Sequence, residues 1–176
     1  MTFWDALTDN ITPWLHILAV TVWVGPQFMM FIAAVPAIRT IEDQRTRARV
    51  MRTIVTRFGW MAWAAMLVIV LSGISNLFQV GSDADFSLWS SDYRWFHLFS
   101  LKMVLVGFMV LLTGVHTFIV GPKQLQLAED ENADPAELSR LRRSSMMLSG
   151  LSLLFSIVVI LVALIVADHA YSFQLT

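Results

Sequence analysis

Four long apolar stretches constrain this 176-residue chain more than any other feature of its sequence. They run over residues 11–38, 60–78, 95–120 and 146–167. A helix of about 20 apolar residues crosses the hydrocarbon core of a bilayer, and each stretch is about that long or longer. None of them alternates with the period of two that barrel strands require. The sequence therefore predicts an all-α fold, an integral membrane four-helix bundle that forms a single domain over residues 1–176.

The composition agrees with a lipid environment and excludes several classes of protein. Hydrophobic residues make up 57% of the chain and charged residues only 14%, about half the charged share of a soluble domain. The net charge of −1 excludes a nucleic-acid binder that works through a broadly basic surface. The lack of cysteine excludes disulfides, zinc fingers, iron–sulfur clusters and c-type haem attachment. The lipid bilayer is thus the first predicted partner, and nucleic acid is not one.

The basic residues predict how the spans are oriented. Ten of the 12 lysines and arginines lie in the two connections after the first and third spans (Arg39, Arg45, Arg47, Arg49, Arg52 and Arg57; Lys123, Arg140, Arg142 and Arg143). Short loops rich in Lys and Arg stay on the cytoplasmic side of a membrane. We therefore expect a multi-pass protein of the cell (inner) membrane, with the Arg-rich loops in the cytoplasm and both termini outside.

Both basic connections also carry helical signals. Apolar residues recur at helical intervals between Ile41 and Arg57, so we expect the second span to continue into this segment as a helix. In the second connection, Asp134 is a natural N-cap with Pro135 at the first helical position and Glu137 at the third. A helix is therefore expected to begin there and to lead into the fourth span.

Ionisable side chains inside the spans are the first candidates for function, because each is costly to place in a bilayer. His16 lies about one turn inside the first span. His97 and Lys102 lie near the start of the third span, and His169 follows the fourth. These four belong to the predicted outer half of the membrane, whereas His116 stands alone in the inner half.

Haem b is the first group that such side chains predict. A helix bundle holds haem b with ligands from two helices, across a slot lined by small and aromatic residues. His16 would be one axial ligand, with Trp23 two turns along on the same helix face. His97 or Lys102 would be the opposite ligand, and Arg94 and Lys102 are candidate partners for the haem propionates.

Copper and the absence of any ligand are the alternatives. His16, His97 and His169 gather toward the predicted outer ends, and three imidazoles suit a copper ion drawn from outside. A third hypothesis is a cofactor-free structural subunit of a larger membrane complex. The serines of the fourth span suit the close helix packing that this hypothesis requires (Ser145, Ser149, Ser152 and Ser156).

Several segments resemble the CopD-like membrane family, which includes copper-resistance D domains and, more distantly, HemJ-type protoporphyrinogen oxidases. In the first span they are Trp14–Gly25 and Val35–Arg39, in the second Arg57–Phe58 and Ser72–Leu77, and in the third Leu101–Lys102. The HemJ-type branch implies haem b bound by a first-span histidine, with an essential lysine in the third span. The matching positions are His16 and Lys102. The segment Val35–Arg39 is closer to the CopD branch, which implies copper.

The leading hypothesis is therefore a membrane haem b protein that transfers electrons or acts as an oxidase, with other membrane redox subunits or a quinone as partners. A copper-binding or copper-transporting protein of the CopD type is the alternative. The residues neither require nor exclude an enzyme that acts on a porphyrin or a quinone.

Overall fold

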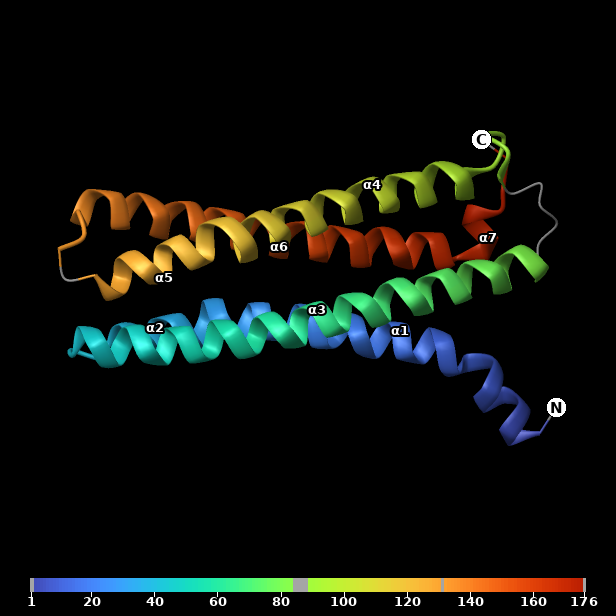
Figure 1. The fold of residues 1–176 in the computed structure, drawn as a ribbon. Helices are drawn as coiled ribbons and strands as arrows, with labels where there is room; N and C mark the ends of the chain where they lie inside the picture. Colours follow the sequence, from blue (N-terminus) through green and yellow to red (C-terminus); the bar gives the residue numbers. More distant parts are fainter. Residues whose placement is uncertain (1, 84–88, 131, 176) are drawn as a thin grey trace.

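The computed structural model describes residues 2–83, 89–130 and 132–175, and its long elements are all helices (Figure 1). In chain order the elements are α1 (Phe3–Met29), the π-helix η1 (Met30–Ala34), α2 (Val35–Arg39), α3 (Gln44–Asp83), α4 (Arg94–Val115), the π-helix η3 (His116–Val120), α5 (Gly121–Glu129), α6 (Pro135–Ala167) and α7 (His169–Ser172).

Four helical stretches are long and apolar enough to cross a membrane. They are Asn10–Arg39, Gln44–Val80, Arg94–Glu129 and Pro135–Ala167. This confirms the prediction of an all-α membrane bundle. Each stretch is longer than its apolar part, because the helices continue into the polar connections. The second one begins at Gln44, so the basic segment that follows the first span is helical, as the spacing of its apolar residues predicts.

The chain forms two helical hairpins that lie side by side (Figure 1). The first hairpin pairs α1 with α3, and the second pairs α4 with α6. Both chain termini, the end of α3 and the start of α4 lie at one end of the bundle, which we call the terminal end. The connections after α2 and α5 lie at the opposite end, the loop end. The first turns of α1 bend away from the other helices, and Pro13 interrupts the helical hydrogen bonding there.

A π-helical turn occupies corresponding places in the two hairpins. In η1 the backbone N–H of Val35 donates to the carbonyl of Met30, and in η3 that of Gly121 donates to the carbonyl of His116. The next residue is a proline in both cases, which has no N–H and whose ring crowds the carbonyl four residues back. The extra residue of a π turn relieves this crowding. The two hairpins therefore share one register.

That register places two of the candidate residues at equivalent positions. His16 precedes η1 by fourteen residues, and Lys102 precedes η3 by the same number. Trp23 and Met109 form a second equivalent pair, each seven residues before its π segment, and both are buried. Side chains at equivalent positions of two packed hairpins lie at the same depth in the bundle.

Aspartates begin two of the long helices. Asp134 is the N-cap of α6: its side chain accepts a hydrogen bond of 2.9 Å from the backbone N–H of Ala136, and Pro135 lies in the first turn, which confirms the prediction. Asp43 precedes α3, and its carboxylate accepts a hydrogen bond of 2.8 Å from the backbone N–H of Thr46. Hydrogen bonds from the side chain and backbone of Thr46 lower the pKa of Asp43 below its ordinary value.

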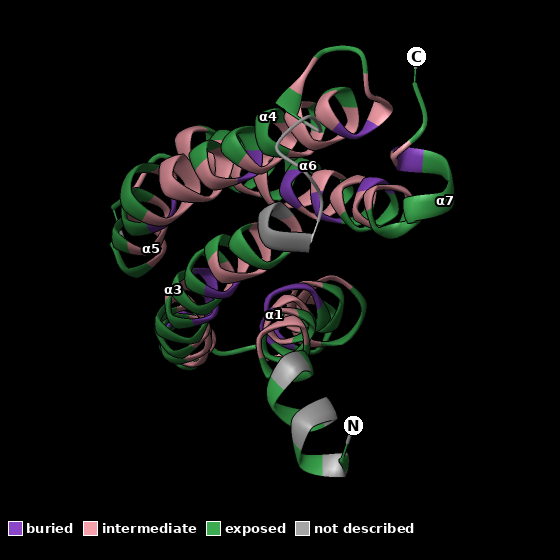
Figure 2. Cartoon of the chain, turned by 90° about the vertical axis from the view of Figure 1, so that its right-hand side faces the viewer, coloured by how far each residue is buried: buried purple, intermediate pink, exposed green. Residues whose placement is uncertain are grey.

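Only part of each helix is buried, and the buried segments are spread over the bundle (Figure 2). Trp23 of α1, Ala62, Ala65 and Met66 of α3, and Met109 of α4 belong to one apolar cluster. Large apolar side chains on the outside of the bundle remain exposed, among them Trp60 at 78% and Phe78 at 75%. Such a surface suits contact with lipid.

Two ion pairs join helices near the loop end. Arg52 of α3 donates two hydrogen bonds to the carboxylate of Glu129 of α5, at 2.7 and 2.6 Å, and so links the two hairpins. Lys123 of α5 pairs with Glu137 of α6 at 2.8 Å. Both pairs are substantially exposed, so solvent screens them.

We expect Glu129→Gln to destabilise the protein only slightly. The bidentate pair with Arg52 is about half exposed, and exposed pairs contribute about 0.2–1 kcal/mol. Thermal unfolding in detergent measures the loss. Glu42→Gln, which changes an exposed carboxylate in the connection before α3, is the control. A loss above about 2 kcal/mol for Glu129→Gln alone would contradict the prediction.

Candidate functional site

His16 of α1 contacts α3 through a hydrogen bond inside the bundle. Its Nδ1 lies 3.0 Å from Oγ of Ser72. Ser72 is buried, with 6% of its surface exposed. Its hydroxyl donates to the backbone carbonyl of Val68 at 2.5 Å, with the carbonyl of Ile69 at 3.3 Å as a second acceptor. The hydroxyl proton is thus used within α3, so Oγ is left as an acceptor for the imidazole.

This arrangement fixes the tautomer of the His16 ring. Because the Ser72 hydroxyl accepts, the ring proton is on Nδ1, and the lone pair of Nε2 is free. A metal-binding imidazole commonly donates from one nitrogen to a protein group and coordinates through the other. His16 therefore has the state in which an imidazole binds a metal or a haem iron.

Gly73 of α3 makes room for this ring. A Cβ atom at Gly73 would lie 3.3 Å from Cε1 and 3.6 Å from Nδ1 of His16. The first distance is tighter than ordinary van der Waals contact, so a side chain here would press on the imidazole. The lack of a side chain next to Ser72 therefore allows the ring to approach α3 closely.

Lys102 of α4 faces the same region from the second hairpin. It is half-buried, and its charge lies within electrostatic range of the His16 ring. The structure shows no hydrogen bond or ion pair to its amine among the described residues. One turn beyond Ser72, the buried Oδ1 of Asn76 also has no hydrogen-bond partner there. This part of the bundle thus holds unused polar atoms on both hairpins, which is typical of a site that receives a polar or charged ligand.

The other predicted site residues make different contacts. His97 is exposed, and its Nε2 lies 2.9 Å from the carbonyl of Ser91. Arg94 donates to Oε1 of Gln174 at 3.0 Å and lies over the ring of Tyr171 at 4.8 Å, so it holds the C-terminal segment. His169 is exposed and stacks on Phe173, with ring centroids 4.4 Å apart.

The predicted three-histidine copper site does not form. Among the described residues, which include all four histidines, no group of three His, Cys, Asp or Glu side chains is close enough to hold a metal ion. His97 and His169 are each engaged at the terminal end, while His16 faces α3. The spacing of residues along a span gives their depth in the membrane but not the helix face they occupy, so the sequence could not show that these three histidines lie apart.

The comparisons with known proteins identify a family. The copper resistance protein D (CopD) family matches residues 52–166. The chain belongs to the CopD family. No curated protein and no solved structure matches it. The family match supports the predicted membrane location and the connection with copper resistance.

The CopD match covers only part of the candidate site. It includes Ser72, Gly73 and Lys102, but it begins after the first span, so His16 lies outside it. The structure nevertheless joins the two parts, because His16 contacts Ser72 directly. The assignment of His16 thus depends on the geometry and not on the family match.

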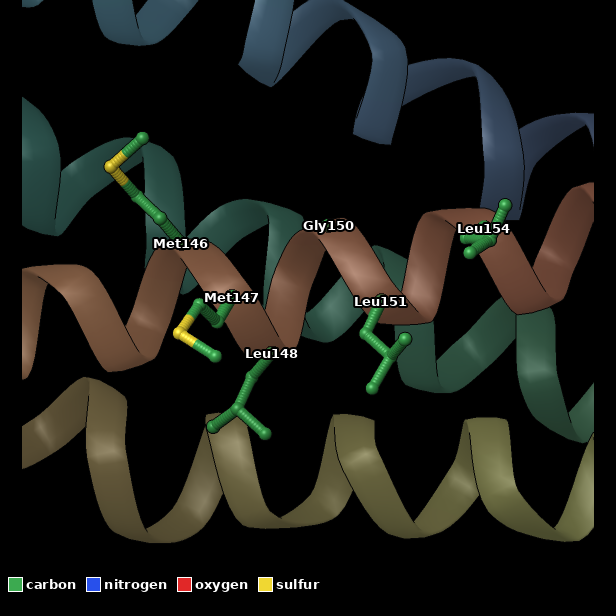
Figure 3. Close-up of a pocket in the computed structure, with 6 residues that line it drawn as sticks. All are labelled: Met146, Met147, Leu148, Gly150, Leu151 and Leu154. Atoms are coloured by element: carbon green, nitrogen blue, oxygen red, sulfur yellow. The ribbon is translucent and has the colours of Figure 1, made fainter.

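An apolar cavity of about 330 Å³ lies away from these residues, on α6 toward the loop end (Figure 3). Its lining consists of Met146, Met147, Leu148, Gly150, Leu151 and Leu154. None of these side chains carries a charge, and none is a candidate site residue. The cavity therefore adds nothing to the site at His16.

The sequence alone did not reveal the partners of His16. In the sequence, Ser72 and Gly73 belong to the segment of the second span that resembles the CopD-like family, and nothing in that segment indicates a contact with His16. Because Ser72 is 56 residues from His16, its role depends on how α1 packs against α3. Trp23, predicted to line a ligand slot, is buried in the core, and its Nε1 donates to Oγ of Ser156 on α6 at 3.3 Å.

We expect Gly73→Ala to weaken metal binding at His16 without unfolding the protein. The new methyl group would press on the imidazole, while alanine is the better helix former by about 1 kcal/mol. Titration with silver(I), a redox-inert substitute for copper(I), should show a roughly three- to tenfold loss of affinity. Gly59→Ala in the same helix is the matched control, since a Cβ there meets nothing within 4 Å. Equal affinities of the two variants would contradict the prediction.

Proposed function

We propose that this CopD protein handles copper, and that it binds copper(I) as cargo through Nε2 of His16. The orientation predicted from the basic loops would place this site in the outer half of the membrane. The protein would thus receive the ion from the side on which the chain termini lie.

The free Nε2 lone pair of His16 is the observation on which this proposal depends. The hydrogen bond to Ser72 keeps the ring proton on Nδ1, and a neutral imidazole is a good copper ligand. Membership of a copper resistance family gives copper priority over the other metals that imidazole binds.

The site suits an ion in transit better than a resident cofactor. One imidazole supplies only one ligand. Among the described residues, no group of three His, Cys, Asp or Glu side chains lies close enough together to hold a metal ion tightly. The Lys102 ammonium lies within electrostatic range and opposes a positive ion at His16. Transport requires binding that is strong enough for entry and weak enough for release, and these features favour weak binding.

Haem b is the second candidate ligand, and a specific arrangement supports it. His16 and Lys102 occupy equivalent positions in the two hairpins and lie within electrostatic range of each other. A haem held between the hairpins would take His16 as one axial ligand and Lys102 as the other, or as a propionate partner. A haem protein of this kind would exchange electrons with a membrane redox partner or a quinone.

An optical spectrum and a metal titration of the purified protein test both candidates. We expect no Soret band, saturable binding of silver(I) in the absence of reductant, and, in a separate anaerobic titration with ascorbate, saturable binding of copper(I). His97→Ala should bind like the wild type, because the ring of His97 contacts Ser91 at the terminal end. A Soret band would support haem instead. A protein that shows no Soret band and binds no metal would support the cofactor-free subunit.

A further inference from the structure

One face of α4 carries a line of chemically distinctive side chains. Lys102, Met109 and His116 are spaced by seven residues, or two helical turns, so they follow one another along the same side of the helix. Each step covers about 10 Å along the axis. Lys102 is near the terminal end, Met109 is in the middle of the bundle, and His116 is toward the loop end.

The middle of this line contacts both α6 and α1. Oγ of Ser156 lies 3.2 Å from Sδ of Met109 and 2.8 Å from the carbonyl of Ser152, and it accepts from Nε1 of Trp23 at 3.3 Å. The serine has one proton, so when it donates to the nearer carbonyl the lone pairs of the Met109 sulfur are free. Trp23 is two turns from His16 on α1 and belongs to the same buried cluster as Met109.

Hydroxyl groups continue the line toward the loop end. Oγ1 of Thr113 lies 3.2 Å from Oγ of Ser152. One helical turn further on, Nε2 of His116 lies 2.9 Å from Oγ of Ser145. Polar contacts between α4 and α6 therefore extend from Met109 to His116.

His116 has a nitrogen available for a ligand. Nε2 of His116 is engaged with Ser145, whereas Nδ1 has no hydrogen-bond partner among the described residues. In the tautomer that has the ring proton on Nε2, the lone pair of Nδ1 is available. His116 is the first residue of η3. A Cβ atom at Gly121 would lie 2.9 Å from the carbonyl oxygen of His116. Only glycine therefore fits there without moving the backbone that positions His116.

We propose that copper(I) crosses the bundle along this line, from His16 past the sulfur of Met109 to Nδ1 of His116, which is a second binding site toward the loop end. This inference rests on the proposed function. Thioether sulfur and imidazole nitrogen are ligands that copper(I) accepts at low coordination number, and the hydroxyl groups between them stabilise a cation on the way.

The structure shows this route closed at the level of Met109. Met109 is 4% exposed, Ser156 2% and Trp23 3%. An unbranched thioether changes rotamer easily, so Met109 can turn to bind an ion and then release it. The side chain that closes the route is thus also the ligand at its midpoint.

Transport into liposomes tests the route separately from binding. The full-length protein is reconstituted into phosphatidylcholine–phosphatidylglycerol vesicles that contain a silver-binding dye, and silver(I) is added outside. We expect His116→Ala to slow entry at least tenfold, while silver binding at His16 in equilibrium titration stays within about twofold of wild type. Met109→Leu, which keeps the volume and removes the sulfur, should slow entry to a similar extent.

Met103→Leu is the matched control, because Met103 lies on α4 but its side chain is 42% exposed on the outside. It should transport like the wild type. If His116→Ala and Met109→Leu both transport at the wild-type rate, the route is wrong even though copper binding at His16 stands. If the wild-type protein binds no silver, the proposed function itself fails. If His116→Ala does not fold, the transport rate of Met109→Leu alone decides whether the proposed route is correct.

Discussion

Replacing His16 with alanine should reduce the affinity for silver(I) or copper(I) at least a hundredfold. His16 is the only imidazole that the structure places between α1 and α3 with Nε2 free and Nδ1 donating to a buried hydroxyl. Removing it takes away the main ligand of the proposed site. Equilibrium titration with a competing chelator measures the loss, and transport into vesicles should fall in parallel.

Ser72→Ala separates the ligand from the group that orients it. The variant keeps the imidazole but removes the acceptor of its Nδ1 proton, so the ring can rotate and change tautomer. Partners that orient a metal-binding histidine are worth about ten- to a hundredfold in affinity. We therefore expect an intermediate loss. Ser75→Ala, on the same helix and outside this contact, is the control.

Measurements on His16→Ala and Ser72→Ala can also contradict the proposal. A purely structural His16 would make both variants less stable and leave any metal binding unchanged. Thermal unfolding in detergent measures that effect independently of the titration. Metal binding by His16→Ala with wild-type affinity would remove the basis of the proposed function.

The sequence predicted the four-helix architecture because membrane spans are coded locally. Each span needs only a sufficient run of apolar residues, and the start of α6 needs only Asp134 followed by Pro135. The π turns were not predicted. Pro36 and Pro122 indicate a local disturbance, but whether a helix responds with a kink, a break or an extra residue depends on its packing.

The candidate site was predicted less well because its contacts are long-range. His16 and Lys102 were recognised as costly polar residues in a membrane, and the structure brings them within electrostatic range. The hydroxyl that accepts from His16 belongs to another helix, and periodicity within one span does not reveal how two spans face each other. In the sequence His116 stands alone, because its partner, Ser145, is likewise on another helix.

Lys102→Leu should strengthen copper(I) binding by roughly tenfold. Two unit positive charges about 10 Å apart, with an effective dielectric constant near 20, repel each other by about 1.7 kcal/mol. Leucine removes the charge and, unlike methionine, adds no thioether ligand for copper(I), so an ion at His16 gains that energy. Titration with silver(I) at low and high ionic strength measures it. Lys123→Leu, whose charge lies at the loop end and pairs with Glu137, is the matched control and should have no effect.

The sign of the Lys102→Leu effect also decides between the two candidate ligands. A haem would lose an axial ligand or a propionate partner, so haem content would fall and the Soret band would weaken or shift. A copper ion would lose only a repelling charge, so its affinity would rise. If Lys102 instead ligates copper through a neutral amine, the affinity would fall about as far as it does for His16→Ala. Tighter binding in this variant, together with weaker binding in His16→Ala, is the combination that only a lone imidazole ligand next to an opposing charge produces.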